Sequence, residues 1–323
     1  MEVVLSKGDG KMEPREILIK IDGERGALGA WLYQGVGKRL IVYLSPICLH
    51  GGWFKEALAE VAGQLKATLV AIDLPGIGQS QGGITVGNRK GLFNKIRSCC
   101  DFELLTLCQQ LQRTIHWLKQ EFRPETVYIL GSSMGGIVAS YLLAADKGDV
   151  LDGAIFQAGF ASSGAEIGQY VKPRILKISQ WRHYDELKRR FKPPIPVFVF
   201  VNWSIPSTKA VTKQFNETRK LITRFLKDPD TVISFTLKSL ESLINAPEII
   251  LPPNVPVLLL KSENDLIPAN QQTEAFLERH SCDKTIVSLK GAPHIVFESK
   301  EHTQAAIKAI QKWLKKVESQ RVG

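Results

Sequence analysis

Apolar positions along the chain follow two different repeats, which predict strands that alternate with helices. Residues 16–22 and 27–34 alternate apolar and polar side chains around a glycine-containing turn, the pattern of a β-hairpin. Further strands are predicted from short apolar runs at 40–44, 68–74, 127–130, 153–157, 257–260 and 285–289. Helical spacing of apolar residues occurs at 54–65, 101–119, from about 133, at 270–279 and at 302–317. This alternation predicts an α/β fold with a mostly parallel central sheet flanked by helices on both faces.

One long segment interrupts the alternation and predicts a cap (lid) insertion between the sixth and seventh predicted strands. We expect residues 1–159 and 254–323 to form the core and residues 160–253 the cap. The run 194–201 could compete with 253–260 for a place in the sheet, because both are apolar and proline-bounded. Carboxylates closely follow only the second run, so we place that one in the sheet.

Composition narrows the class of protein. Hydrophobic residues make up 44% and charged residues 23% of the 323 residues, which is globular and excludes a disordered chain. The longest apolar run, 195–201, is far shorter than the ~20 residues that span a bilayer. The N-terminal residues have no basic start and no long apolar run, so we expect no signal peptide. The five cysteines have no metal-ligand spacing, and we expect a cytoplasmic protein without structural zinc.

The formal net charge of +10 raises the question of an anionic partner. No nucleic-acid-binding motif is present, so we expect no nucleic acid partner. The segment 172–192 carries eight Lys or Arg residues against Asp185 and Glu186. This basic part of the cap is either a solvated helix or a peripheral contact with an anionic membrane surface.

The strongest chemical motif lies at 127–139. A predicted strand leads into Gly131-x-Ser133-x-Gly135, and an apolar predicted helix follows. The two glycines remove side chains that would clash where strand and helix meet, so the Ser133 hydroxyl projects above the sheet. The start of the helix also favours developing negative charge beside that hydroxyl. Ser133 is therefore the predicted nucleophile.

The same spacing occurs a second time, at Gly78-x-Ser80-x-Gly82. From composition, about 0.1 copies would be expected in a chain of this length. The second copy also follows a predicted strand, but polar, glycine-rich sequence comes after it instead of a helix. Because the motif works only in its strand–turn–helix context, we prefer Ser133 over Ser80.

A serine nucleophile needs a base and an acid that orients the base. In this architecture the expected chain order is Ser, then Asp or Glu, then His. His294 and Asp265 follow two successive predicted strands, at the sheet edge where α/β sites lie. We predict His294 as the base and Asp265 as the acid, with Glu263 as the rival acid.

Two backbone N–H groups should bind the oxyanion. One is that of Met134, the residue after the nucleophile. The other should come from the loop after the predicted strand 40–44. Counting from the end of that strand favours Ile47, which we prefer, whereas the dipeptide His50-Gly51 instead suggests Gly52.

With these residues in place, the chain resembles the α/β-hydrolase superfamily over nearly its whole length outside the cap. The resemblance rests on Gly131–Gly135, the stretch Asp73-x-Pro75-Gly76-x-Gly78-x-Ser80, Asp265 before Ile267-Pro268, and Gly291–His294. Within the superfamily it is most similar to serine aminopeptidase S33-like and monoacylglycerol lipase-like hydrolases. Those relatives usually carry His-Gly directly after the third strand, where this chain has Ser45-Pro46.

The resemblance implies the α/β-hydrolase fold and, with the motifs, a serine hydrolase without metal or organic cofactor. We expect it to cleave a carboxylic ester or thioester, of an acyl lipid or a small ester, through an acyl-enzyme intermediate. Alternatives are an acyltransferase or a peptidase with the same Ser-His-Asp triad, and a non-catalytic binding module. The expected partner is a small acyl compound, while chain length, leaving group and oligomeric state are left open.

Overall fold

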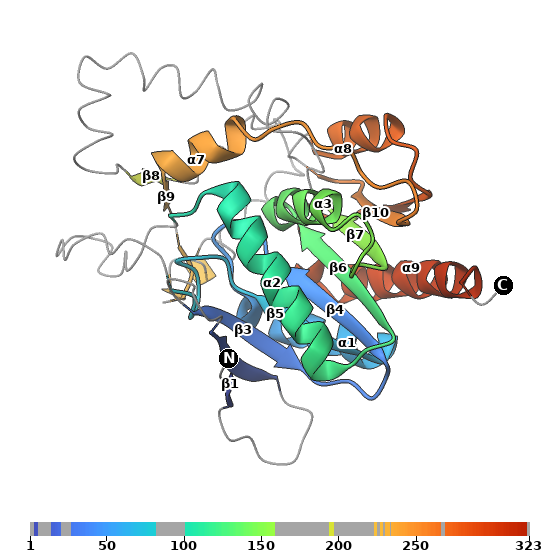
Figure 1. Cartoon of the computed structure of the whole chain (residues 1–323), viewed down its shortest axis with the longest axis horizontal. Helices are drawn as coiled ribbons and strands as arrows, with labels where there is room; N and C mark the ends of the chain where they lie inside the picture. The colour runs from blue at the N-terminus through green and yellow to red at the C-terminus, as the bar shows by residue number, and fades with distance from the viewer. Residues whose placement is uncertain are drawn as a thin grey trace, which may run out of the picture.

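The structure is a computed structural model that describes residues 3–5, 14–20, 27–81, 101–158, 194–196, 223–224, 227–228, 230–232, 234–265 and 269–321. Its main sheet has nine strands in the order β1-β2-β3-β5-β4-β6-β7-β10-β11 (Figure 1). The strands are β1 (Val3–Leu5), β2 (Arg15–Ile19), β3 (Leu28–Tyr33), β4 (Arg39–Leu44), β5 (Ala67–Ile72), β6 (Thr126–Ser132), β7 (Gly153–Gln157), β10 (Val257–Ser262) and β11 (Lys284–Leu289). From β5 to β11 neighbouring strands run parallel, whereas β1, β2 and β3 pair antiparallel.

Helices cover both faces of this sheet. The described helices are α1 (Lys55–Leu65), α2 (Leu104–Phe122), α3 (Met134–Asp146), α7 (Leu237–Ile244), α8 (Ala269–Glu278) and α9 (Lys300–Ser319), with short 3-10 turns η1 (Gly51–Phe54) and η3 (Val296–Glu298). Helices α2 and α3 lie on one face, and α1 and α9 lie on the other (Figure 1). This is the predicted α/β architecture.

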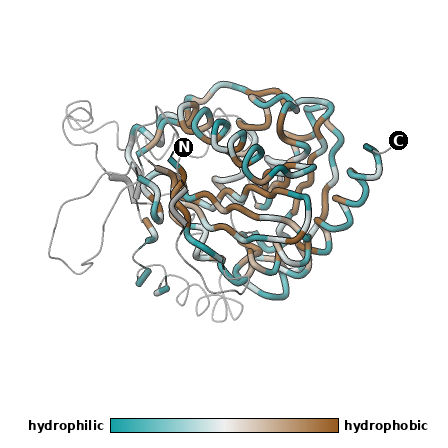
Figure 2. Tube along the Cα trace, turned by 60° about the horizontal axis from the view of Figure 1, so that its bottom comes forward, coloured by the Kyte–Doolittle hydropathy of each residue, from teal (hydrophilic) through white to brown (hydrophobic). Residues whose placement is uncertain are grey.

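The core explains why apolar runs form the central strands. Side chains of β4 alternate between the two faces: Leu40 and Val42 pack with α2 and α3, whereas Ile41 and Tyr43 pack with α1 and α9. All four are fully buried. A strand covered on both faces needs apolar residues at every position, which is why the run is continuous. The hydropathy colouring shows the apolar strands through the middle of the molecule (Figure 2).

Some helices and strands begin or end at other residues than predicted, because hydrogen bonds that the apolar pattern does not reveal set their ends. The second predicted helix begins at Leu104 instead of 101, because the Glu103 side chain accepts the N–H groups of Leu105 and Thr106 and caps the helix there. The predicted strand 68–74 ends at Ile72, after which the Asp73 N–H bonds the Gly29 carbonyl. The first strand, β1, was not predicted at all, since three residues are too short to show a repeat.

The rivalry between the two apolar runs is resolved. Strand β10 lies in the main sheet between β7 and β11. In the run 194–201, β8 (Pro194–Pro196) pairs instead with β9 (Ser234–Thr236) in a separate two-stranded sheet. Most of the predicted cap, including the basic segment 172–192, lies outside the described residues, and its boundaries remain a prediction.

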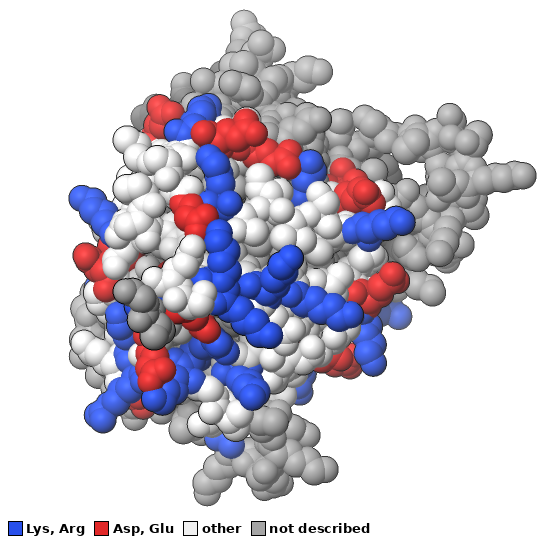
Figure 3. All heavy atoms as spheres, turned by 90° about the vertical axis from the view of Figure 1, so that its right-hand side faces the viewer, with Lys and Arg blue, Asp and Glu red and all other residues white. Residues whose placement is uncertain are grey.

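Helix α9 packs one apolar face against the sheet. Ile307, Ile310, Trp313, Leu314 and Val317 are buried, and the lysines at 308, 312, 315 and 316 are exposed. Figure 3 views the side to which the end of α9 points and shows Lys and Arg side chains with acidic groups between them. Across the described residues, we find no helix long and apolar enough to cross a membrane.

Candidate active site

The motif around Ser133 forms a tight turn between β6 and α3. Ser133 has φ 52° and ψ −118°, so a non-glycine residue occupies a positive-φ conformation. Such strain costs on the order of 1–3 kcal/mol and persists where surrounding contacts enforce it. Here the Ser133 N–H donates to the Gln157 carbonyl at 3.0 Å, and its carbonyl accepts from Gly136 N–H at 2.8 Å.

The flanking glycines are required by close backbone approach. A Cβ at Gly131 would lie 2.4 Å from the Gly135 carbonyl oxygen. A Cβ at Gly135 would lie 2.1 Å from the Leu44 oxygen and 2.8 Å from the Ser45 oxygen. All three distances are below the 3.0 Å that real Cβ atoms keep, so side chains are excluded where strand and helix meet. The geometry shows why glycine is needed at both positions, and the role of Ser133 as nucleophile stays a prediction.

Ser133, His294 and Asp265 come together at the ends of three strands. His294 Nε2 lies 3.0 Å from Ser133 Oγ, and His294 Nδ1 lies 2.9 Å from each Asp265 oxygen. The Asp265 side chain is 1% exposed and the His294 side chain 18%. The buried carboxylate bonds one ring nitrogen of the imidazole, Nδ1, while the other nitrogen, Nε2, points to the hydroxyl. The arrangement can pass the hydroxyl proton to a base whose tautomer is set by the acid.

The rival residues are engaged elsewhere. Glu263 is exposed and accepts the Gly291 N–H at 2.8 Å, so Asp265 alone of this pair contacts His294. The Ser80 hydroxyl accepts the Gly29 N–H at 2.8 Å and donates to the Asp73 carbonyl at 2.6 Å. Those two bonds connect a loop to β3, which is a structural role.

The two predicted oxyanion donors lie on segments that meet at Gly135. Met134 is the first residue of α3. Strand β4 ends at Leu44, which pairs with Gly131 of β6. The backbone oxygens of Leu44 and Ser45 lie close to Gly135, near the start of α3. Ile47 follows Ser45 by two residues, so its segment begins next to the start of this helix. The rival Gly52 instead lies against Trp31 of β3, on the side of β4 away from β6.

One residue near the site was missed by sequence reasoning. Gln157 ends β7 and is fully buried, and its Nε2 donates to the His294 carbonyl at 2.7 Å and to Ser262 Oγ at 3.4 Å. Its own carbonyl accepts the Ser133 N–H. It therefore contacts both the serine turn and the histidine loop. The available signal was a single amide at the end of an otherwise apolar strand.

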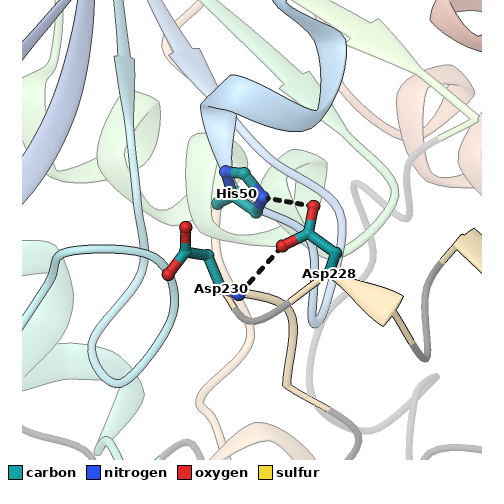
Figure 4. A group of neighbouring side chains, drawn as sticks. All are labelled: His50, Asp228 and Asp230. Atoms are coloured by element: carbon teal, nitrogen blue, oxygen red, sulfur yellow. Dashed lines mark hydrogen bonds and ion pairs between the residues drawn. The ribbon is translucent and has the colours of Figure 1, made fainter.

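A second cluster, His50, Asp228 and Asp230, has the residue types of a metal centre. Its possible ligand atoms all lie within 4.8 Å of one another (Figure 4). Both oxygens of Asp228 are already bonded, one to His50 Nε2 at 3.1 Å and the other to the Asp230 N–H at 2.8 Å. The contacts thus form a hydrogen-bonded link between the segment 228–230 and the loop before η1.

Comparison of the sequence with models of protein families identifies the family of this chain. The sequence model of the family described as serine aminopeptidase, S33 matches residues 37–301. The chain belongs to this family. This S33 hydrolase therefore has the fold that its strand order and the turn at Ser133 indicate. No curated protein sequence matches it.

Solved structures share the fold of the S33 hydrolase at low identity. An α/β hydrolase from Penicillium sp. sh18 is 16% identical with a TM-score of 0.64, covering 98% of each chain. A carboxyl esterase from Bacillus coagulans is 15% identical with a TM-score of 0.64, covering 95% of this chain and 99% of that one. A monoacylglycerol lipase from Paleococcus ferrophilus is 19% identical with a TM-score of 0.57, covering 90% and 99%.

Proposed function

We propose that this S33 hydrolase cleaves a carboxylic ester or thioester of an acyl compound through an acyl-enzyme on Ser133. The observation that carries the proposal is the continuous chain of contacts from Ser133 Oγ through His294 to Asp265, at 3.0 Å and 2.9 Å. A buried carboxylate, an imidazole and a hydroxyl on a strained turn together form a serine nucleophile that a base can activate.

The proposed reaction has two halves. In the first, His294 Nε2 takes the Ser133 proton as Oγ attacks the carbonyl carbon, and the imidazolium then protonates the leaving group. In the second, His294 removes a proton from water as the water oxygen attacks the acyl-enzyme; the imidazolium then returns that proton to Ser133 Oγ, and the acid is released. Asp265 holds the imidazole tautomer and stabilises the imidazolium in both halves.

The N–H groups of Met134 and Ile47 are proposed to bind the oxyanion of each tetrahedral intermediate. The start of α3 adds the positive end of its helix dipole beside Ser133. A single donor of this kind typically contributes about 10²–10³-fold to kcat. This chemistry requires no metal or organic cofactor.

The substrate class is proposed as a small acyl compound. The carboxyl esterase and monoacylglycerol lipase with the same fold favour an ester, and the family's name includes a peptidase. An acyltransferase would use the same three side chains with an alcohol or amine in place of water. These alternatives share the acyl-enzyme and differ in leaving group and acceptor.

The test is labelling with a fluorophosphonate probe together with hydrolysis of p-nitrophenyl esters of increasing chain length. We expect labelling of the wild type and Ser80→Ala, and none of Ser133→Ala. His294→Ala should label very slowly. Ser80→Ala is the matched control, because it removes the hydroxyl of the other Gly-x-Ser-x-Gly motif.

Aminoacyl nitroanilides and added alcohol acceptors complete the test. Nitroanilide cleavage in preference to esters would favour the peptidase, and ester product formed with the acceptor would favour the transferase. Folded wild-type protein that neither labels nor hydrolyses any ester would contradict the proposal. Labelling retained in Ser133→Ala would contradict the choice of nucleophile.

A further inference from the structure

The loop after β4, residues 45–50, makes a sharp turn that depends on contacts from outside it. The Leu49 N–H donates to the Pro46 carbonyl at 3.3 Å, which closes a four-residue turn. Cys48, the third residue of this turn, has φ 70°. A non-glycine residue in this left-handed region costs roughly 1–2 kcal/mol. The direction of the Ile47 N–H, at the second position, therefore depends on what keeps the turn closed.

Two contacts from residues 228–232 keep this loop in place. The Asp228 carboxylate lies 3.1 Å from His50 Nε2 at the end of the loop (Figure 4). The Val232 N–H donates to the carbonyl of Cys48, the strained residue, at 3.1 Å. The side chains of His50 and Asp228 are 7% and 22% exposed, so little water competes for their bond.

The segment 228–232 is itself attached to the core. The second Asp228 oxygen accepts the Asp230 N–H at 2.8 Å, and the Asp230 carbonyl accepts the Gly78 N–H at 3.0 Å. Asp228 thus has one oxygen on its own segment and one on the loop. Because Asp230 is bonded to Gly78 of the core, the bonds from Asp228 and Val232 to the loop 45–50 tie that loop to the core.

We propose that Asp228 and His50 are positioning residues for the oxyanion hole: their hydrogen bond holds the loop 45–50 so that the Ile47 N–H faces the reacting carbonyl. This inference rests on the proposed function. It follows that a donor in the hydrolase core is kept in place by residues that the sequence assigns to the cap insertion. Neither side chain touches the reacting atoms.

The first test is Asp228→Ala assayed on the best p-nitrophenyl ester. We expect kcat to fall about 10- to 100-fold, less than the loss of a whole donor, with KM within about twofold. The matched control is Arg224→Ala. Arg224 also bonds the core, with Nη2 donating to the Trp53 carbonyl at 2.5 Å, but among the described residues its side chain has no hydrogen bond or ion pair with residues 45–50. Its kcat should stay within about twofold of wild type.

Two readouts separate positioning from simple stabilisation. An alkyl trifluoromethyl ketone forms an oxyanion on the enzyme, so its inhibition constant should rise in Asp228→Ala by the same factor as kcat falls. Asp228→Asn should recover most of the activity. Asparagine retains both bonds when its oxygen accepts the Asp230 N–H and its amide donates to His50 Nε2 in the other tautomer.

The outcomes are distinguishable. If the wild type is active and Asp228→Ala has the same kcat as Arg224→Ala, this inference is overturned while the proposed function stands. A rise in KM at constant kcat would also overturn it, since that would place Asp228 in substrate binding. Wild-type protein that neither labels nor hydrolyses esters would overturn the proposed function and this inference together. His50→Phe, which keeps a ring of similar size but has no nitrogen to bond Asp228, should reproduce the Asp228→Ala defect as a second variant.

Discussion

Gln157→Met tests whether a buried amide at the end of β7 positions the histidine base. In the native protein, Gln157 Nε2 donates to the His294 carbonyl at 2.7 Å, while the backbone carbonyl of Gln157 accepts the Ser133 N–H. Methionine has similar length and volume but no donor, so the substitution removes both side-chain bonds, to His294 and to Ser262, and leaves the backbone bond. The His294 loop then loses a direct connection to the strand beside the nucleophile.

The magnitude follows from which polar atoms lose partners. Leaving the His294 carbonyl without this donor costs about 1–3 kcal/mol. The Gln157 Oε1 atom is itself buried without a hydrogen-bond partner in the described structure, so removing it offsets part of that loss. We expect a net loss of about 1 kcal/mol in the free energy of unfolding. A displacement of the imidazole approaching 1 Å from Ser133 Oγ would lower kcat by up to about 100-fold.

Denaturant unfolding and steady-state ester hydrolysis measure the two effects separately. The control is Gln304→Met, which removes an equally direct amide bond, from Gln304 Nε2 of α9 to Glu60 Oε2 of α1 at 2.6 Å. Its kcat should match wild type. Equal kcat in the two methionine variants would refute the positioning role of Gln157, whatever the stability change.

Two further predictions follow from packing and from charge. Gly135→Ala should destabilise the fold by about 1–3 kcal/mol and lower kcat, because the new Cβ meets the Leu44 oxygen at 2.1 Å. Gly63→Ala, where a Cβ meets nothing within 4 Å, should leave both unharmed in the same thermal and kinetic assays, and similar behaviour of the two would contradict the steric argument. Burial raises the pKa of Asp73 from 3.8 to about 8, so the native state retains a proton that the unfolded chain releases, and stability falls as pH rises through that window. Asp73→Asn should remove this loss, and its advantage over wild type in urea unfolding should grow by up to about 1.4 kcal/mol per pH unit between pH 5 and 8, whereas parallel pH curves would contradict the protonated native state.

The sheet was largely predictable because burial on two faces leaves a strong signal. Strands 153–157 and 285–289 were predicted to within one residue. Packing against the helices requires apolar side chains at regular positions of a strand, and these positions are visible in the sequence. The start of α2 at Leu104 was not, because a Glu103 side chain that caps two N–H groups leaves no periodic trace. Strand β1 escaped for a similar reason, as three residues gain their structure from pairing with β2.

The sequence by itself determined Ser133, Asp265 and His294 as candidates. Each lies in the loop or turn that follows a predicted strand, and they come in the chain order serine, acid, histidine that this architecture leads us to expect. The sequence context also favoured Ser133 over Ser80, because polar, glycine-rich sequence follows the motif at Ser80. Only the tertiary structure decided which carboxylate meets the imidazole, since Glu263 and Asp265 are two residues apart and the loop's path alone turns one inward. It also revealed Gln157 and the Asp228–His50 bond, because these contacts join residues more than a hundred positions apart and depend on packing that no local pattern records.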